Sequence, residues 1–376
     1  MGEDLKPLVF DNGTGIFKAG FGGEDQPRVV ISTIVGSPKH TNIMDMMIEK
    51  SHYIGYEVQF TNKLLTIKRP IENGVIRNWD DMEKIWHYAF YRTLKVDPEE
   101  HPVILTEAPL TPRHIRETMT QIMLETFSVG KINIQISSVL ALYACNKTTG
   151  VVVDMGFDQT FVVPIYDGYN LPHATARFGI GGKTLTDYLI KLLQEKQICF
   201  ESFREKQDLN SMKENFCYVA QDFEKEMKKY QEYKAPFKKK YKLLDQQIIS
   251  IGKERFLTTE PIFEPSLVGI ESKSLPKLTL NTINKCDSEY RNHLAGSILI
   301  SGGSSLFKGL SDRFEKEIWE SNKSNLKINL IHERKRQFLT WLGGSILSQL
   351  SEFKKLYLTK EEYNESGIFY SRRKIF

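Results

Sequence analysis

Apolar and polar positions repeat in two segments of the chain, residues 8–20 and residues 151–168. In each segment, a run of β-branched and aromatic residues reaches an Asp-x-Gly sequence and then resumes as a second apolar run. Two short apolar runs separated by Asp and Gly are typical of a β-hairpin with a tight turn. The repeat therefore predicts two hairpins and indicates two domains of common ancestry.

Helical periodicity occupies much of the sequence around these hairpins. Beyond Asn78, a predicted N-cap, apolar residues return at helical spacing from Trp79 to Phe90. Residues 113–127 and 183–195 show the same spacing. Helices that alternate with strands are typical of α/β proteins. The length of 376 residues allows two or three domains.

Composition changes this picture little. Hydrophobic residues make up 40% and charged residues 26% of the chain, which is an ordinary globular balance. The net charge of +4 does not by itself argue for a nucleic-acid partner. The four cysteines are scattered without a CxxC pair, so we expect neither a zinc site nor a disulfide framework. We expect the protein to lie in a reducing compartment. We also expect neither a signal peptide nor a membrane span, which needs roughly 20 apolar residues.

The turn of the first hairpin carries residues suited to a phosphate ligand. Gly13 and Gly15 let the backbone turn tightly and direct N–H groups at an anion. Thr14 adds a hydroxyl donor, and Lys18 can reach back to phosphate oxygens. Asp11 would face a divalent cation through water, because Mg²⁺ dehydrates reluctantly. Asn-Gly sequences are also common in ordinary hairpins, so this motif alone leaves both interpretations open.

Two further glycine-containing turns strengthen the phosphate interpretation. The second hairpin supplies Asp154 and Gly156, placed to clasp a phosphate chain from the side opposite the first turn. Gly302 and Gly303 follow a strand predicted at 297–300 and open a predicted helix. A helix that begins directly after a strand is a common edge for an anion or a nucleotide.

Longer stretches of the sequence resemble the actin family. The three turns, in this order, resemble the nucleotide-binding fold that actin shares with Hsp70. Other stretches narrow the resemblance to the actin family and cover nearly the whole chain without a large insertion. They are residues 79–86, 99–102, 105–110, 164–169, 171–174, 213–214, 217–220 and 341–347.

The resemblance implies an α/β fold of the actin, Hsp70 and sugar-kinase type, with two pseudo-repeated domains around a nucleotide cleft. The first large domain would comprise residues 1–144 and 339–376, with 33–69 as its smaller subdomain. The second would comprise residues 145–338, with 181–270 as its smaller subdomain. ATP or ADP would lie in the cleft with Mg²⁺ or Ca²⁺.

The resemblance also implies which residues contact the nucleotide. Asp11 and Asp154 would take part in catalysis and face the metal through water. Phe307 stands where a Tyr is usual, so it can stack on the nucleotide but lacks the hydroxyl group. The cofactor-binding residues would be Gly13, Thr14, Gly15, Lys18, Gly156, Lys213, Glu214, Gly302, Gly303 and Phe307.

Several residues depart from the family pattern where ATP hydrolysis would occur. Ser137 and Phe161 stand where a Gln and a His position the attacking water, and neither can do so in the usual way. Such a loss typically lowers the rate roughly 10²–10⁴-fold. Phe157 replaces an acid, and Asn73 replaces a His that senses phosphate release. Asp158 replaces a Gly, where it would either repel the phosphates or substitute for the lost acid.

These departures predict that ATP is held as a structural ligand and is hydrolysed slowly or not at all. Compensating substitutions with normal turnover are the alternative, although catalytic geometry tolerates little displacement.

Surfaces that serve assembly in the family are also present. Residues 40–50 match the loop that inserts into the next subunit, and they are rich in methionine, which adapts to irregular grooves. A loop folded on its own domain is the alternative for this segment. Residues 264–271 match the cross-strand plug. The apolar cleft that receives partner helices and actin-binding proteins corresponds to Tyr143, Ala144, Thr148, Ile346, Leu347, Leu350 and Leu356, although the helical spacing also fits a core-facing helix.

A lysine-rich segment, residues 225–242, is unexpected. Eight lysines occur in it, with Tyr230, Tyr233, Phe237 and Tyr241 interleaved. A solvated helix and loop is the simpler interpretation. A docking surface for an acidic partner or for nucleic acid is the alternative.

Two functions remain open at this point. The first is an ATP-binding cytoskeletal protein of the cytoplasm that polymerises with itself or with other actin-family subunits, or joins or caps a filament. The second is a structural subunit of a multiprotein complex, chromatin-remodelling or dynactin-like, in the cytoplasm or the nucleus. The loop, plug and cleft favour the first; the altered catalytic positions and the lysines favour the second. A sugar kinase or an Hsp70 chaperone would leave the actin-like stretches unexplained, and nucleic acid is not an expected partner.

Overall fold

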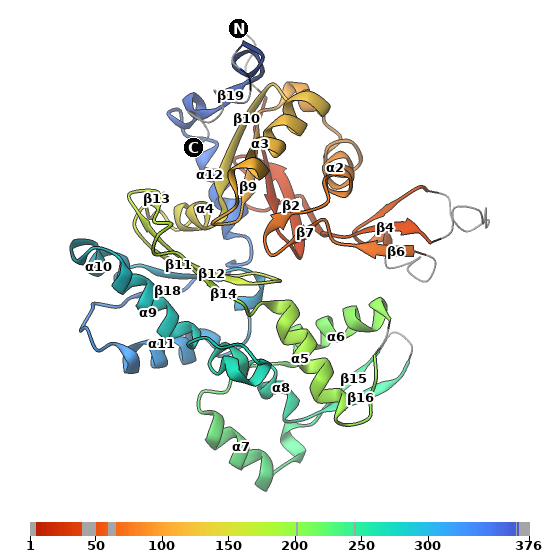
Figure 1. Cartoon of the computed structure of the whole chain (residues 1–376). Coiled ribbons are helices and arrows are strands. Elements are labelled where there is room, and N and C mark those ends of the chain that lie inside the picture. The colour runs from red at the N-terminus through yellow and green to blue at the C-terminus, as the bar shows by residue number, and fades with distance from the viewer. Residues whose placement is uncertain are drawn as a thin grey trace. The chain divides into compact units, whose positions relative to one another are not determined.

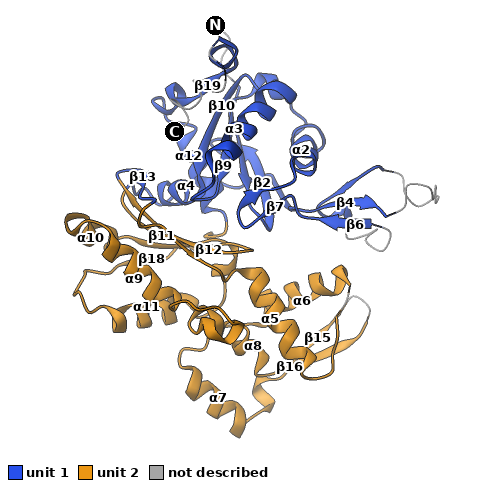
Figure 2. Cartoon of the chain, in the orientation of Figure 1, with its two compact units in different colours: residues 1–148, 167–172, 338–376 blue, residues 149–166, 173–337 orange. Residues whose placement is uncertain are grey.

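The computed structural model describes residues 5–39, 50–58, 65–200, 202–243, 246–365 and 367. The chain forms two compact units, which Figure 2 colours separately. Unit 1 comprises residues 1–148, 167–172 and 338–376, and unit 2 comprises residues 149–166 and 173–337. The loop expected to insert into a neighbouring subunit, residues 40–50, lies outside the described residues except for Lys50. The division into four subdomains stays a prediction.

The described part of unit 1 is built on a sheet with the strand order β19-β10-β9-β1-β2-β3 (Figure 1). β1 is antiparallel to β2 and parallel to β9, so it lies in the middle of the sheet, and its apolar residues are fully buried. The strands are β1 Leu8–Asn12, β2 Ile16–Phe21, β3 Val29–Ser32, β9 Val103–Glu107, β10 Lys131–Ile136 and β19 Leu358–Thr359.

The helices of unit 1 begin where their caps predict. Asn78 precedes α2 (Trp79–His87), and its side-chain oxygen accepts a hydrogen bond from the Asp81 backbone N–H at 3.1 Å. This geometry confirms the predicted N-cap. The predicted helix 113–127 is also confirmed, as α3 (Arg113–Gln121) followed by a π-helical turn to Thr126. A second π-helical turn, residues 88–94, extends α2, and a 3₁₀ turn covers residues 98–100.

Two more helices of unit 1 pack against each other beside the sheet. α4 (Ser137–Tyr143) follows β10 directly, and α12 (Leu339–Leu347) packs against it. A Cβ atom added to Gly343 of α12 would lie closer than 3.0 Å to backbone atoms of Leu140, so the two helices meet backbone to backbone at this glycine. The Trp341 indole N–H also donates to the Val9 carbonyl at 3.0 Å, which ties α12 to β1.

Smaller elements complete unit 1. β4 (Val35–Pro38), β5 (Tyr53–Ile54) and β6 (Leu65–Lys68) form a separate sheet, and β7 (Ile71–Glu72) pairs with β8 (Val75–Ile76). β13 (Tyr169–Asn170) lies in the 167–172 segment, and residues 353–356 form a 3₁₀ turn. The core of the unit gathers fully buried aromatic rings, each of which stabilises the fold by about 1.5–3 kcal/mol. They include Phe10, Phe17, Trp86 and Phe90.

Unit 2 repeats the central arrangement of unit 1. β11 (Gly150–Met155) is antiparallel to β12 (Thr160–Tyr166) and parallel to β17 (Ile298–Ser301), as β1 is to β2 and β9. β14 (Ala176–Phe178) pairs with β12, and β18 (Leu330–Ile331) pairs with β17. Both predicted hairpins are therefore confirmed, and the common ancestry of two domains stays a prediction.

Helices surround this sheet and extend away from it. α5 (Gly182–Gln194) confirms the helix predicted at 183–195. The others are α6 Phe203–Phe216, α7 Phe223–Glu232, α8 Glu254–Leu257, α9 Leu275–Lys285, α10 Ser288–Ala295 and α11 Leu310–Ser321. β15 (Lys239–Lys242) and β16 (Ile248–Ile251) form a hairpin, and 3₁₀ turns cover residues 235–237, 260–262, 265–268 and 303–305.

One predicted boundary in unit 2 is wrong. The glycine-rich segment after β17 was expected to open a helix, but it forms only a 3₁₀ turn, and α11 begins at Leu310. Gly309 has a left-handed φ of 81°, and Lys308 forms a β-bridge with Tyr218. These two features hold the segment out of the helix until residue 310, because a left-handed residue interrupts helical dihedral angles.

None of the four cysteines, all of which the structure describes, is in a disulfide bond. Among the described residues, no helix combines the length and the apolar character needed to cross a membrane.

Candidate functional site

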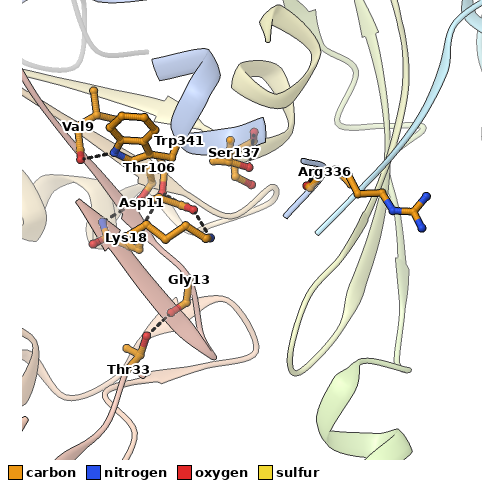
Figure 3. Close-up of polar contacts among 12 residues, drawn as sticks. Val9, Asp11, Gly13, Lys18, Thr33, Thr106, Ser137, Arg336 and Trp341 are labelled. Atoms are coloured by element: carbon orange, nitrogen blue, oxygen red, sulfur yellow. Dashed lines mark hydrogen bonds and ion pairs between the residues drawn. The ribbon is translucent and has the colours of Figure 1, made fainter. Parts of the chain in front are cut away.

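The first hairpin turn of unit 1 holds a buried carboxylate. Asp11 is 5% exposed and lies opposite Lys18 in the β1–β2 register. The Lys18 ammonium is 2.6 Å from Asp11 Oδ2, and the Thr106 hydroxyl donates to Asp11 Oδ1 at 3.1 Å (Figure 3). A carboxylate held by a cation on one side and a hydroxyl on the other has a fixed orientation at the end of β1.

The turn after Asp11 is fixed by its glycines and by Thr33. The Thr33 hydroxyl donates to the Gly13 carbonyl at 2.6 Å, and the Thr33 N–H donates to the Gly15 carbonyl at 3.1 Å. A Cβ atom on Gly13 would lie closer than 3.0 Å to the Ile16 carbonyl oxygen, so a side chain at position 13 would distort the turn. This tight, side-chain-free turn is the backbone form that approaches an anion closely.

Asn12 anchors the same turn to two other elements. Its N–H donates to Thr106 Oγ1 at 2.9 Å, and its side-chain amide donates to the Thr106 carbonyl at 3.0 Å. The Trp86 indole N–H, from α2, donates to Asn12 Oδ1 at 3.1 Å. The turn therefore cannot shift without breaking contacts to β9 and α2.

Ser137 lies at the same sheet edge as Asp11. It directly follows β10, and β1, β9 and β10 are parallel, so Asp11, Thr106 and Ser137 lie near the carboxyl ends of three adjacent strands. The carboxyl edge of a parallel sheet is the usual ligand-binding edge of α/β proteins. The Ser137 carbonyl accepts a hydrogen bond from the Thr340 hydroxyl at 3.3 Å, which links α4 to α12.

In unit 2, the second hairpin turn contacts the third glycine-containing segment. The Ser304 hydroxyl donates to the Gly156 carbonyl at 2.7 Å, and Asp154 lies opposite Ser301 in the β11–β17 register. Gly302 has a left-handed φ of 91°, and a Cβ atom there would lie 2.9 Å from Asp154 Oδ1 and closer still to the Met155 carbonyl. Only glycine fits at position 302, both for its dihedral angle and for space.

Lys213 extends this cluster of loops. It is 3% exposed, and its ammonium donates to Gly182 O at 2.7 Å, Thr186 Oγ1 at 2.9 Å and Asn210 Oδ1 at 2.9 Å. Burial lowers the pKa of Lys213 to about 8. The Gly182 N–H in turn donates to the Gly156 carbonyl at 3.1 Å. Lys213 is thus joined to the second hairpin turn through the start of α5.

Other predicted site residues of unit 2 lie next to this cluster in sequence. Glu214 accepts a hydrogen bond from the Asn210 side chain at 2.6 Å. Phe307, which is 7% exposed, precedes Lys308, whose bridge to Tyr218 joins the third segment to the end of α6. Gly303 faces open space, since an added Cβ atom would meet nothing within 4 Å. We refer to Gly156, Gly182, Lys213, Gly302, Gly303 and Ser304 as the unit 2 loop cluster.

Comparison with known protein families identifies the family of the chain. The family model named Actin matches residues 2–376, which is essentially the whole chain. The chain belongs to the actin family. Actin-family proteins typically bind a nucleotide together with a divalent cation. In this actin-family protein, Gly13, Gly156 and Gly302 each occupy a place where an added Cβ atom would collide with backbone, so none of the three turns has room for a side chain there.

One of the predicted catalytic positions of this actin-family protein is occupied by the side chain of Phe161. Phe161 lies in β12, opposite Asp154, and its ring is 6% exposed. The Arg177 guanidinium stacks over that ring, 5.5 Å from its centre. A phenyl ring covered by a guanidinium offers no hydrogen-bond acceptor or donor to a water molecule. The Phe161 side chain therefore packs, and its place in a catalytic position stays a prediction.

Two residues expected to line the partner cleft of the actin family are exposed in unit 1. Ile346 is 37% and Leu350 is 52% exposed, which contradicts the alternative of a wholly core-facing helix for these two side chains. Leu347, by contrast, packs against a buried cluster that contains Trp341 and Phe353. Leu356 is 49% exposed. Leu347 therefore packs inward, whereas Ile346 on α12 and Leu350 and Leu356 beyond its end are exposed, and their role in partner binding stays a prediction.

The lysine-rich segment differs from a nucleic-acid surface in one respect. All eight lysines are exposed, but Tyr230 and Phe237 pack against Phe256, and Tyr241 packs against Phe216. Of the four interleaved aromatic residues, Tyr233 alone is strongly exposed, at 67%. Most of these rings therefore serve the core of unit 2, and few are left to stack on bases.

Sequence reasoning missed several residues that hold the turns in place. Thr106 could have been found, because it lies at the carboxyl end of the strand that follows β1 in the parallel part of the sheet. Thr33, Thr186 and Asn210 left no such signal, since their roles depend on strand register and helix packing. Ser304 adjoins predicted Gly303, and its hydroxyl is the link to Gly156.

Proposed function

We propose that this actin-family protein binds ATP with a divalent cation and acts as an assembly subunit that polymerises, or joins or caps an actin-type filament. The observation that supports it most directly is the pair of glycine-confined turns, one in each unit, at the carboxyl edge of each sheet. Asp11 and Asp154 would face the cation through water, since Mg²⁺ keeps several waters and takes few carboxylates.

Hydrolysis would be slow in this proposal. Ser137 has a short side chain, and Phe161 has no polar atom. A general base or water-positioning group must lie within hydrogen-bond reach of the water it orients, and its loss lowers the rate roughly 10²–10⁴-fold. Binding is less sensitive, because the glycines, Lys18 and Lys213 are held by contacts that do not involve Ser137 or the Phe161 ring.

A second candidate function is a structural subunit of a larger complex, with nucleotide as a structural ligand. The lysine-rich segment favours it. α7 has no buried residue, and the exposed lysines continue from α7 through β15. Exposed lysines attract acidic partners through their field, although Lys225 and Lys229 also pair with Asp222 and Glu226. Loss of salt-dependent partner binding in Lys238/Lys239/Lys240→Glu would support this candidate, and unchanged binding would exclude it.

One experiment tests the binding site and the hydrolysis step together. Purified protein is assayed for bound adenine nucleotide after denaturation, and for phosphate release with ATP and Mg²⁺ on the same sample. We expect retained nucleotide with slow phosphate release. Gly302→Ala should lose nucleotide, whereas the matched control Gly179→Ala should retain it, because its added Cβ atom meets only Ile270 Cδ1 at 3.5 Å. A wild-type protein that retains no nucleotide and melts identically with and without ATP would refute the proposal.

Sedimentation then separates the two functions. Filaments that pellet with ATP and Mg²⁺ support the polymerising subunit. A persistent monomer that co-purifies with other subunits supports the complex component.

A further inference from the structure

Within the described part of the chain, β15, the strand of the lysine-rich segment, has β16 as its partner in an antiparallel sheet of two strands (Figure 1). The second edge of β15 pairs with no other described strand. An unpaired strand edge presents a row of backbone N–H and C=O groups, to which a further extended chain can add as a new strand. The hairpin therefore offers one edge for strand addition next to the lysines.

The hydrogen bonds of the hairpin show which backbone groups point to this second edge. The Leu243 N–H donates to the Gln247 carbonyl at 2.9 Å, so Leu243 is bonded toward β16. Bonded and non-bonded positions alternate along an antiparallel pair, so Tyr241 is bonded toward β16 as well. The backbone groups of Lys240 and Lys242, which alternate with these positions, point to the second edge. In the part of the chain that the structure describes, neither lysine has a backbone hydrogen bond to a further segment.

The same two lysines lie on the solvent-facing side of the hairpin. Lys240 lies opposite Ser250, and both residues are exposed. Lys242 is exposed too, and it lies opposite Ile248, which is 63% exposed. The other side of the hairpin is buried, as at Ile249. Because the outward side chains and the outward backbone groups belong to the same two residues, an added strand would meet both at once.

Positive charge is concentrated next to this edge. Residues 233–242 contain five lysines and no acidic residue. None of the five forms an ion pair with another described residue, whereas Lys225 and Lys229, which do, lie on α7. Like charges directly opposite each other destabilise a strand pair, so this edge disfavours pairing with a second copy of itself. An acidic strand is attracted by the same charges, and β16, which has no charged residue, offers no such attraction.

We propose that the second edge of β15 binds an acidic, extended segment of a partner protein by strand addition. Backbone hydrogen bonds to Lys240 and Lys242 fix the segment, and its carboxylates at alternate positions lie beside the two lysine side chains, because residues two apart share a face of a strand. The added strand runs antiparallel to β15, the direction that is more stable per residue. This inference deepens the second candidate function and rests on its acidic partner.

The test measures peptide binding to the full-length protein by fluorescence anisotropy. The probe is fluorescein-labelled Thr-Val-Glu-Val-Glu-Val-Thr amide, whose two glutamates share a face in an extended chain. We expect saturable binding that weakens as the salt concentration rises, because exposed charges are screened. The peptide with glutamine in place of both glutamates should bind about tenfold more weakly, since it lacks the charges that pair with the lysines.

N-methylated peptides separate strand addition from plain attraction between charges. In the antiparallel arrangement, the glutamate N–H groups donate to the carbonyls of Lys240 and Lys242. N-methylation of both glutamates should therefore weaken binding at least tenfold. The matched control is N-methylation of two valines, whose N–H groups point away from β15, and it should leave binding unchanged. Equal binding of the two N-methylated peptides overturns the proposal.

Two double variants locate the bound peptide. Lys240→Glu with Lys242→Glu should weaken binding at least tenfold, because both contacts are on the strand edge. Lys228→Glu with Lys234→Glu is the matched control, since it changes the charge of the same segment equally at exposed positions outside β15. The control should weaken binding less than about threefold. Equal losses in the two double variants would show diffuse attraction and overturn strand addition.

Amide hydrogen exchange followed by NMR reports on the edge directly. Saturating peptide should slow the exchange of the Lys240 and Lys242 N–H groups at least tenfold, whereas the Tyr241 N–H, already bonded toward β16, should not change. Unchanged exchange at both lysines overturns the proposal, as does the absence of saturable binding of the glutamate peptide at millimolar concentration. Nucleotide retention and sedimentation are measured separately, so a protein that co-purifies with other subunits but fails these tests loses only the strand-addition proposal.

Discussion

Glu260 makes the stability of this protein depend on pH in a direction that the structure fixes. The carboxyl group is 5% exposed, and burial raises its pKa from 4.5 to about 7. Below pH 4.5 both the folded and the unfolded chain carry the proton. Between pH 4.5 and about 7 the unfolded chain has lost it while the folded chain still holds it, so the free energy of unfolding falls as the pH rises. The difference corresponds to about 3 kcal/mol.

Glu260→Gln removes this dependence, because glutamine does not titrate. We expect the difference in free energy of unfolding, variant minus wild type, to increase from pH 5 to pH 8. The increase should approach about 3 kcal/mol. The charged groups that face Glu260 are Arg313, Glu317 and Glu264, and Arg313 works against the rise in pKa.

Urea unfolding at several pH values measures the effect, with hydrogen exchange of α11 to follow unit 2 by itself. Glu289→Gln is the matched control, because substitutions of exposed residues usually change stability by less than about 0.5 kcal/mol. A difference between Glu260→Gln and wild type that stays constant across this pH range would refute the reasoning. A difference that shrinks as the pH rises would refute it as well.

Three further predictions follow from the loops and the helix contacts. Gly343→Ala should lower the free energy of unfolding by about 1–3 kcal/mol, measured by urea unfolding, because the new Cβ would force α12 away from Leu140. Lys213→Met should reduce nucleotide retention in a protein that remains folded by circular dichroism, since three oxygens lose their donor. Ser137→Gln with Phe161→His should raise phosphate release at least tenfold, and an unchanged rate would show that hydrolysis is limited elsewhere.

Local sequence signals predicted the hairpins and the helix starts well. The Asp-x-Gly turns and the Asn78 cap depend on neighbouring residues, so they can be read from a few positions. The delayed start of α11 could not be read in this way. It depends on the bridge between Lys308 and Tyr218, residues that only the folded chain brings together.

The candidate site also contains both features that local sequence predicts and features that depend on tertiary packing. Asp11 and Lys18 face each other because hairpin register pairs them, and register follows from the turn. The burial of Lys213 and its contacts with Thr186 and Asn210 depend on how α5 packs against α6. The ion pair between Glu260 and Arg313 left no signal in the sequence, because the two residues are far apart along the chain.

The residues proposed to bind the nucleotide differ from Ser137 and Phe161 in the structural contacts that fix them. The residues proposed to hold the nucleotide are built into the scaffold: Gly302 is required by its dihedral angle, and Lys213 is held by three hydrogen bonds. Ser137 and Phe161 stand at positions where the resemblance implies residues that orient water, and this role stays a prediction. A protein altered in this way would lose turnover first and keep binding. Bound ATP at about 1,000 times its dissociation constant would still stabilise the fold by about 4 kcal/mol, which is enough for nucleotide to act as a structural ligand.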